Sequence, residues 1–319
     1  MVGLRQALAW AGAAALGTLA VDGDMFKGAF FGAIFGLILT WANTPVKVPV
    51  KSGGIVVTGA SSGIGKHAAE KLAALGFTVF AGVRKAVDGI SLKELGCVPV
   101  ILDVTSEEGV VSAAKEVRAK LQERGVPLVA IVNNAGIGGS GLPIELEAAE
   151  NMQWVFDCNV FGIVRMYKAF VPLLREAGGG RIVNVSSVLG RSCVGYSATY
   201  CMSKHAVEAI TGCSRIELRK WGISVSVLNP GYVRTDLQTK AKEKRMTMFD
   251  NLRAQHPKET HELYPRLFDK DSAIKRQAKV CLPALYVHAF SCLYMYAYAF
   301  ITLLSCKRMI MYVEMTTHV

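Results

Sequence analysis

The chain has 319 residues, which suits one large α/β domain with appendages or two small domains. Hydrophobic residues make up 51% of it, a high share for a water-soluble enzyme, so membrane segments must be sought. The formal net charge is +11, but no run of interleaved basic and aromatic residues accompanies it, so a nucleic-acid partner is not expected. The eight cysteines show neither a CxxC pair nor zinc-ligand spacing, which predicts free thiols and no metal site.

The N-terminal segment, residues 1–50, has the composition of a membrane anchor. Apolar runs at 7–21 and 28–42 flank a polar break that contains Asp22 and Asp24. Each run is shorter than the roughly 20 residues that span a bilayer, so a hairpin anchor is favoured, with a signal peptide as the alternative. Basic residues at both ends of the segment favour a cytosolic position for both ends.

From about residue 52 the pattern changes to short β-branched runs that alternate with amphipathic stretches. Near-continuous apolar strands indicate burial on both faces of a sheet. The expected strands are 54–59, 78–83, 98–104, 128–134, 181–187 and 223–230, and the expected helices are 64–75, 107–124, 151–175 and 198–220. This alternation predicts an α/β fold, a doubly wound parallel sheet of the Rossmann type, over a catalytic domain at 51–279.

A glycine-rich turn, TGASSGIG, joins the first expected strand to the first helix. Gly59, Gly63 and Gly65 let the backbone turn tightly and approach a pyrophosphate, which then rests against the helix N-terminus. Turns need glycine in any case, but the position after a lead-in strand favours a dinucleotide site.

Polar residues follow several other strands. Asp103 ends the third strand, where its carboxylate can accept from an adenine amino group or cap the next helix. NNAG ends the fourth strand and Ser187 ends the fifth. Asn159 falls inside an otherwise apolar helix, where it bonds a neighbouring backbone group or serves the site. Ligands bind beyond the carboxyl ends of such strands, so these are candidate site residues.

Tyr200 and Lys204 lie four residues apart on an expected helix, so their side chains share one face and can reach the same ligand. Further on, residues 280–306 contain no Asp, Glu, Lys or Arg. That run is long enough to span a bilayer, and a buried helix or lid of the globular domain is the alternative. Residues 280–319 are therefore separated as a divergent hydrophobic segment.

The motifs together resemble the short-chain dehydrogenase/reductase family over roughly residues 53–237. The resemblance is carried by TGASSGIG, NNAG, NVFG, a serine thirteen residues before the tyrosine, YCMSK as the pattern YxxxK, and NPGYVRT. It implies an enzyme that transfers hydride between a nicotinamide and an alcohol or carbonyl.

The resemblance also implies catalytic roles. Tyr200 would exchange a proton with the substrate oxygen, Ser187 would orient that oxygen, and Asn159 would hold a water that relays protons. Lys204 would bond the nicotinamide ribose. A tyrosine with an ordinary pKa of about 10 is a poor base at neutral pH, so Lys204 is also expected to favour the phenolate.

Cofactor contacts follow from the same resemblance. Asn134 would lie against the adenine ribose, and Thr235 would reach the carboxamide. Arg84 ends the second strand, where an acidic residue would suit NAD, so its guanidinium favours the 2′-phosphate of NADP(H), with NAD(H) as the alternative. The residues expected to cradle the cofactor are Gly59, Ser61, Gly63, Ile64 and Gly65.

Within the family, the chain looks most like the retinol and 17-beta-hydroxysteroid dehydrogenase branch, on GFTVFAGVRK, VFDCNVFGIVRM and YCMSKHAVEA. That likeness implies a hydrophobic substrate such as a retinoid, steroid or lipid ketone. The expected location is a membrane, first the endoplasmic reticulum with the catalytic domain in the cytosol, then mitochondria or plastids. The chain is also expected to form a homodimer. Alternative functions are an acyl-dihydroxyacetone-phosphate reductase and a catalytically silent dinucleotide-binding scaffold or redox sensor.

Overall fold

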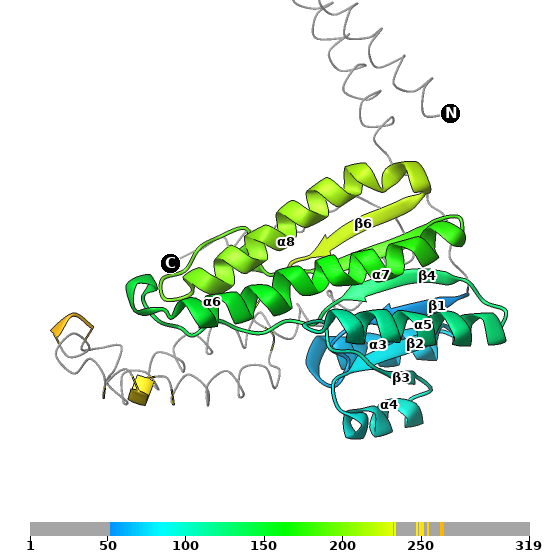
Figure 1. The fold of residues 1–319 in the computed structure, drawn as a ribbon, viewed down its shortest axis with the longest axis horizontal. Coiled ribbons are helices and arrows are strands. Elements are labelled where there is room, and N and C mark those ends of the chain that lie inside the picture. The colour runs from blue at the N-terminus through cyan, green and yellow to red at the C-terminus, as the bar shows by residue number, and fades with distance from the viewer. Residues whose placement is uncertain are drawn as a thin grey trace, which may run out of the picture. The chain divides into compact units, whose positions relative to one another are not determined.

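The computed structural model describes residues 52–231 together with 233, 247, 249–251, 254 and 262–264. Within this part of the chain, six parallel strands form one sheet in the spatial order β3-β2-β1-β4-β5-β6 (Figure 1). The strand order reverses between β1 and β4, which is where such sheets bind ligands. The strands are β1 Gly54–Val57, β2 Thr78–Val83, β3 Val98–Ile101, β4 Leu128–Asn133, β5 Gly180–Val185 and β6 Ile223–Leu228.

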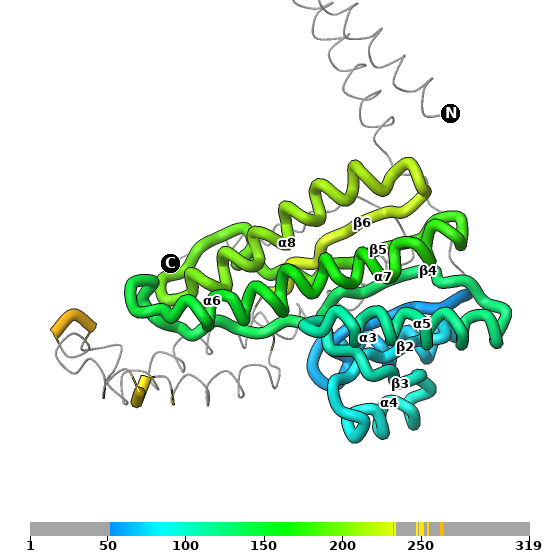
Figure 2. Tube along the Cα trace, viewed as in Figure 1, coloured from blue at the N-terminus to red at the C-terminus, as the bar shows by residue number. Residues whose placement is uncertain are grey.

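Helices cover both faces of the sheet, as the apolar strands require. Helices α5, α7 and α8 lie side by side across one face, and α3 and α4 lie on the other (Figures 1 and 2). The helices are α3 Gly63–Ala74, α4 Ile90–Glu94, α5 Glu107–Glu123, α6 Ala149–Phe156, α7 Gly162–Glu176 and α8 Ala198–Glu217, with a π-helical turn at Asp157–Phe161 between α6 and α7.

The core consists of two apolar layers, because successive side chains of a strand point to opposite faces of the sheet. The layer under α5 and α7 includes Val56, Phe80, Ile131, Ile182, Met166 and Phe170. The layer under α3 and α4 includes Ile55, Val57, Val79, Val132, Val183, Ala69 and Leu92. Burial on both faces holds the strands rigidly, so the residues at their carboxyl ends have well-defined positions.

All expected strands and helices are confirmed, with ends that differ by a few residues. Two features differ from expectation. The helix α4 was missed, because a five-residue helix is too short to show a 3.6-residue period. The helix expected at 151–175 is present, but a π-helical turn at Asp157–Phe161, which was not expected, separates its two α-helical parts α6 and α7.

Several expectations concern residues outside the described part of the chain. These are the N-terminal anchor at 1–50, the hydrophobic segment at 280–319 and the cofactor contact of Thr235. In the part that is described, no helix has both the length and the apolar character needed to cross a membrane. The domain boundaries stay predictions.

Candidate active site

The glycine-rich loop after β1 has a conformation that requires glycine. Gly59 and Gly63 have φ angles of +64° and +56°, in the left-handed region. Gly65 approaches the loop so closely that a Cβ there would lie 2.4 Å from the Gly59 carbonyl oxygen. Since α3 follows with neither a side-chain cap from Ser62 nor an acidic residue in its first turn, its N-terminal N–H groups can receive an anion. Such a cradle fits the pyrophosphate of a dinucleotide.

Asn134, at the end of β4, braces this loop. Its Nδ2 donates to the carbonyl oxygens of Thr58 at 3.0 Å and Gly59 at 3.2 Å. Thr58 Oγ1 in turn accepts from the backbone N–H groups of Asn134 and Ala135, both at 2.9 Å. Asn134 therefore fixes the distance between the ends of β1 and β4, and its expected contact with the adenine ribose stays a prediction.

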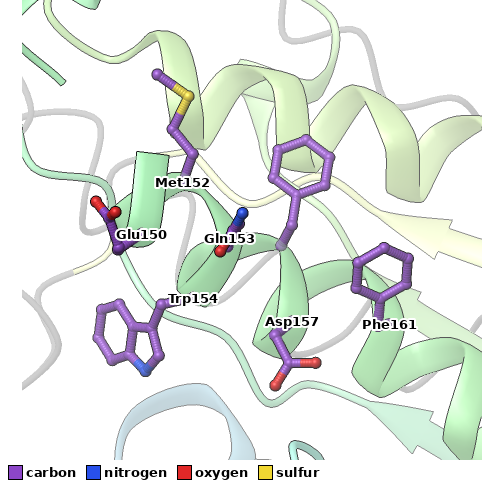
Figure 3. A pocket seen from close by; sticks show the side chains of 7 residues that line it. Glu150, Met152, Gln153, Trp154, Asp157 and Phe161 are labelled. Carbon is purple, nitrogen blue, oxygen red and sulfur yellow. The ribbon is translucent and has the colours of Figure 1, made fainter. Parts of the chain in front are cut away.

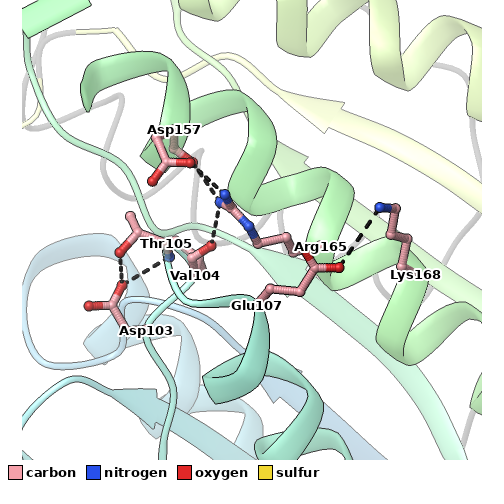
Figure 4. Close-up of polar contacts among 7 residues, drawn as sticks. All are labelled: Asp103, Val104, Thr105, Glu107, Asp157, Arg165 and Lys168. Atoms are coloured by element: carbon pink, nitrogen blue, oxygen red, sulfur yellow. Dashed lines mark hydrogen bonds and ion pairs between the residues drawn. The ribbon is translucent and has the colours of Figure 1, made fainter. Parts of the chain in front are cut away.

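Arg84 and Asp103 follow β2 and β3, at the part of the site where the adenine half of the cofactor is expected to bind, which is called the adenine side below. Arg84 comes directly after β2 and is exposed, so its guanidinium is accessible to a ligand. Asp103 Oδ1 accepts from the N–H of Thr105 at 3.0 Å and from its hydroxyl at 2.8 Å (Figure 4). The helix-cap alternative for Asp103 is wrong, because Ser106 caps α5 through the N–H of Gly109 at 3.0 Å.

Tyr200 and Lys204 lie on one face of α8, as their spacing predicts. Lys204 Nζ is 5.7 Å from the centroid of the Tyr200 ring and donates to the Val185 carbonyl oxygen at 2.9 Å. Only 4% of Lys204 is exposed, and this burial lowers the pKa of its ammonium to about 8. Lys204 is thus anchored to the end of β5, and near neutral pH it still carries most of its charge although burial favours the neutral form.

The pKa of Tyr200 differs from expectation. Burial of the phenol raises this pKa above its ordinary value, and the hydrogen bond with the Ser187 side chain opposes that rise. The expected lowering of the Tyr200 pKa by Lys204 is therefore wrong for the protein alone, because desolvation outweighs the other influences. In this state the phenol holds its proton, as a general acid must.

Ser187 stands at the end of β5 and joins this pair. Its side chain lies near the Tyr200 phenol and opposes the burial-driven rise in the pKa of that group, and its Oγ accepts from the backbone N–H of Leu189 at 3.1 Å. The adjacent Ser186 ties the same strand end to α8 by donating to the Lys204 carbonyl oxygen at 3.1 Å. These bonds fix the end of β5 against α8, so Ser187 and Tyr200 are neighbours although they lie thirteen positions apart in the sequence.

Asn159 lies in the π-helical turn and is 1% exposed. Its Oδ1 accepts from the Ile137 N–H at 2.8 Å, and its Nδ2 donates to the Ile137 carbonyl oxygen at 2.9 Å and to Ser203 Oγ at 3.1 Å. A Cβ on Gly136 would lie 3.3 Å from Asn159 Oδ1 and 3.5 Å from Lys204 Nζ. Asn159 therefore joins the loop at Ile137 to Ser203 of α8, close to Gly136 and Lys204. The water that Asn159 is expected to hold stays a prediction.

Cys158 shows where the π-helical turn lies relative to the other site residues. Burial raises the pKa of its thiol to about 11, and the charges of Lys204 and Arg84 oppose this rise while that of Asp103 adds to it. The turn therefore lies within electrostatic reach of both the catalytic residues and the adenine side.

The surface has an open depression of about 620 Å³ over α6 and the π-helical turn (Figure 3). Its lining includes the exposed side chains of Trp154 and Phe161 together with Asp157. None of Asn159, Ser187, Tyr200 and Lys204 lines it. This hollow is separate from the candidate catalytic residues.

Sequence reasoning missed the residues that hold the site together. Thr58, Ser186 and Ser203 each bond to the backbone or side chain of a predicted site residue. Their positions in the sequence could have pointed to them, because Thr58 lies in TGASSGIG, Ser186 directly precedes Ser187 and Ser203 lies in YCMSK. Their partners, however, depend on the sheet order, which the sequence alone does not show.

The fold and this edge of the sheet define the class of protein: a Rossmann-type α/β protein with a glycine-rich loop that fits a dinucleotide and a candidate catalytic group of Ser187, Tyr200 and Lys204. The family described as "short chain dehydrogenase" matches residues 54–246, more than half of the chain. The chain belongs to the short-chain dehydrogenase/reductase family.

Among curated relatives, the mitochondrial D-beta-hydroxybutyrate dehydrogenase of Bos taurus is 40% identical over 190 residues, which are 57% of this chain and 55% of that protein. The 17-beta-hydroxysteroid dehydrogenase type 2 of Homo sapiens is 37% identical over 63% of this chain and 52% of its own length. Retinol dehydrogenase 16 of Homo sapiens is 34% identical over 68% of both chains. The chain spans about half the length of the first two relatives.

Solved structures agree on the fold. A short-chain dehydrogenase/reductase from Burkholderia phymatum in complex with NAD is 28% identical with a TM-score of 0.56, over 62% of this chain and 72% of that one. A metagenomic short-chain oxidoreductase in complex with NADP is 29% identical with a TM-score of 0.53, over 57% and 83% of the two chains. Similar structures therefore hold either dinucleotide.

Proposed function

We propose that this enzyme uses NADP(H) to interconvert a hydrophobic alcohol and the corresponding carbonyl compound at a membrane. One observation carries the reaction type: Ser187 lies close enough to Tyr200 for its side chain to influence the pKa of the phenol, and the buried Lys204 lies one helical turn further along α8. Two neighbouring hydroxyls of this kind can both hydrogen-bond to one substrate oxygen.

The site residues have complementary tasks in the reduction direction. A nicotinamide held by the glycine-rich loop and Lys204 would supply the hydride that the carbonyl carbon requires. Tyr200, whose pKa is raised, donates its proton to the carbonyl oxygen, and Ser187 orients that oxygen through its hydroxyl. The product is an alcohol, and the phenolate left behind regains a proton from solvent. A phenol that holds its proton is the form that donates in this reduction step.

Apolar side chains near the catalytic tyrosine support a hydrophobic substrate. Leu142 and Phe249 bury against each other, and the ring of Tyr264 packs against that pair. Tyr196, one residue before the N-cap of α8, meets Tyr264 edge-on with ring centroids 6.5 Å apart. The loop after β4, which carries Leu142, also contacts Tyr200 at Gly139, where a Cβ would lie 3.4 Å from the Tyr200 Cβ.

The charge of this region argues against an anionic substrate. Glu145 hydrogen-bonds with the Tyr264 hydroxyl, and Glu147 hydrogen-bonds with Ser140 and Asn151, so two carboxylates lie beside the apolar cluster. A short hydroxy acid would be repelled by them. We therefore favour a neutral retinoid, steroid or lipid ketone over a hydroxybutyrate-like acid.

A substrate screen tests the proposal. NADPH oxidation would be measured with retinal, a 17-keto steroid and acyl-dihydroxyacetone phosphate, and NADH oxidation with acetoacetate. Turnover of retinal or the steroid above the other two supports the proposal. Preference for acetoacetate overturns the hydrophobic assignment, preference for the phosphate ester favours the alternative reductase, and cofactor binding with no turnover favours a silent scaffold.

The preference for NADP(H) rests on Arg84, whose exposed guanidinium follows β2. In Arg84→Asp the phosphate partner becomes a repelling carboxylate. Affinity for NADPH is expected to fall about tenfold to 100-fold, the effect of one charge-assisted contact, while affinity for NADH changes little. Equal losses for both cofactors in a fluorescence titration would show that Arg84 does not select the phosphate.

The membrane location rests on the two apolar runs at 7–21 and 28–42. An anchored enzyme meets substrates that are dissolved in the bilayer, which agrees with a hydrophobic alcohol or ketone. The endoplasmic reticulum, with the catalytic domain on the cytosolic side, is our first choice, ahead of mitochondria and plastids.

A further inference from the structure

Arg165, on α7, connects two parts of the site that lie far apart in the sequence. Its Nη2 contacts Asp157 Oδ1 at 2.6 Å, and its Nη1 donates to the carbonyl oxygens of Val104 at 3.1 Å and Asp157 at 3.3 Å (Figure 4). Val104 directly follows Asp103, on the adenine side, whereas Asp157 opens the π-helical turn that carries Asn159. One guanidinium therefore joins the adenine-side loop to that turn.

The π-helical turn is what brings Arg165 over Asp157. An α-helix rotates by about 100° per residue, so positions seven apart nearly coincide, whereas positions eight apart differ by about 80°. Arg165 and Asp157 are eight apart, and the extra residue of the π-helical turn absorbs that difference. The ion pair and the π-helical turn thus stabilise each other.

Close packing at the same place leaves little freedom between the two parts. A Cβ on Gly162, the first residue of α7, would lie 2.9 Å from the Val104 side chain. If the loop at Asp103 and Val104 moves, the start of α7 must therefore move with it. Asn159 transmits the position of the π-helical turn to the catalytic residues through its bonds to Ile137 and Ser203.

We propose that Arg165 is a positioning residue that couples binding of the adenine half of the cofactor to the placement of Asn159. The inference rests on the dinucleotide site proposed above. Occupation of the adenine side would hold the loop at Asp103 and Val104, and Arg165 would hold the π-helical turn against that loop. Because Asn159 belongs to the π-helical turn, holding the turn also holds Asn159 beside Lys204.

The chain offers a matched control. Arg118 of α5 pairs with Glu176 of α7 through Nη1 and Nη2, each at 2.8 Å from a carboxylate oxygen. This pair also involves α7 and an arginine fork, but it is exposed and lies away from the π-helical turn. Arg118→Gln thus removes a similar ion pair with no expected effect on the site.

The experiment uses the full-length protein and adenosine fragments that lack the nicotinamide, namely 2′,5′-ADP and 5′-AMP. Hydrogen exchange of the backbone amides at 157–161 would be followed with and without the fragment in wild type, Arg165→Gln and Arg118→Gln. Protection at the turn by a fragment that cannot touch the catalytic residues measures the coupling directly, without any turnover.

We expect the fragment to slow exchange at 157–161 in wild type and in Arg118→Gln but not in Arg165→Gln. Because coupling is reciprocal, the affinity of Arg165→Gln for the fragment should fall by about 2- to 30-fold. At saturating NADPH its kcat should also fall, since Asn159 is no longer held. If Arg165→Gln does not fold, Arg165→Lys keeps the charge but cannot make the same forked contacts.

Two negative outcomes have different meanings. If the fragment binds wild type but leaves exchange at 157–161 unchanged, or if Arg165→Gln keeps the protection, the inferred coupling is wrong while the dinucleotide site stands. If neither fragment nor intact NADPH or NADH binds wild type, the proposed cofactor site is wrong and the inference falls with it.

Discussion

At the scale of single residues, burial decides the protonation of the catalytic pair. It raises the pKa of the Tyr200 phenol and lowers that of the Lys204 ammonium to about 8. Both shifts favour the neutral form, as desolvation does for any ionisable group. The pair is therefore prepared to donate a proton from tyrosine, and the phenolate that a base would need is disfavoured in the protein alone.

The substitution Tyr200→Phe removes the hydroxyl and keeps the ring. We expect turnover to be lost while the dissociation constant for NADPH changes little, because the hydroxyl carries the proton. Positioned proton transfer contributes on the order of 100-fold or more, so steady-state assays should show a rate well below about a tenth of wild type. A variant that retains more than this would rule out Tyr200 as the acid.

Lys204→Met is expected to change how stability depends on pH. In wild type the folded-state pKa of about 8 lies below the ordinary 10.5, so the unfolded chain binds more protons between these values. Wild-type stability therefore gains from this group as pH rises from about 8 to 10.5, and below 8 the cost of the buried ammonium is fully present. Methionine has no such cost.

Thermal unfolding at pH 7 and pH 10 checks this sign. The melting temperature of Lys204→Met relative to wild type should be higher at pH 7 than at pH 10. The lost bond to the Val185 carbonyl oxygen lowers the stability of the variant at both pH values. Lys115→Met, at an exposed position on α5, is the control and should show no such change. If the melting temperature of Lys204→Met minus that of wild type stays constant or increases from pH 7 to pH 10, the lowered pKa of Lys204 is contradicted.

At the scale of elements, the junction between β1 and α3 depends on the absence of a side chain. In Gly65→Ala the new Cβ would lie 2.4 Å from the Gly59 carbonyl oxygen and from Asn134 Nδ2, so the start of α3 must move. Overpacking of this kind costs about 1–3 kcal/mol of unfolding free energy, and cofactor affinity should fall because the loop is displaced.

Gly212→Ala is the matched control for this prediction. Gly212 lies inside α8 with nothing within 4 Å of its Cβ position, so alanine should stabilise the helix by about 0.5–1 kcal/mol. Chemical denaturation and cofactor titration would compare the two variants. Unchanged cofactor affinity in Gly65→Ala would mean that the loop does not cradle the dinucleotide.

At the scale of the whole molecule, residues 1–45 are expected to hold the enzyme on a membrane. Each buried aliphatic or aromatic side chain contributes roughly 1.5–3 kcal/mol, so the Leu, Ile, Phe and Trp residues of 28–42 would favour a bilayer strongly. Deletion of 1–45 should move the protein from the carbonate-resistant membrane fraction to the supernatant. If the truncated protein stays resistant, residues 280–306 are a sufficient anchor and the N-terminal assignment is wrong.

Much of the fold and the catalytic group could be predicted because their signals are local. Apolar runs and 3.6-residue spacing predict the strands and helices, and the four-residue spacing of Tyr200 and Lys204 places them on one helix face. The π-helical turn could not be predicted from periodicity, because a single inserted residue barely alters the apolar pattern around Asn159. The Tyr200 pKa was also misjudged, since desolvation depends on the packing around the phenol.

The class of fold and the glycine loop could be predicted from the chain alone, because apolar period and glycine spacing are local features. The roles of the site residues followed from the family resemblance, and their contacts with one another depend on the tertiary structure. Ser187 reaches Tyr200, Asn134 braces Gly59, and Arg165 joins Val104 to Asp157. These contacts join different strands and helices. They exist because the strands are all parallel, which puts their carboxyl ends at one edge of the sheet, and because the order β3-β2-β1-β4-β5-β6 sets which ends are neighbours.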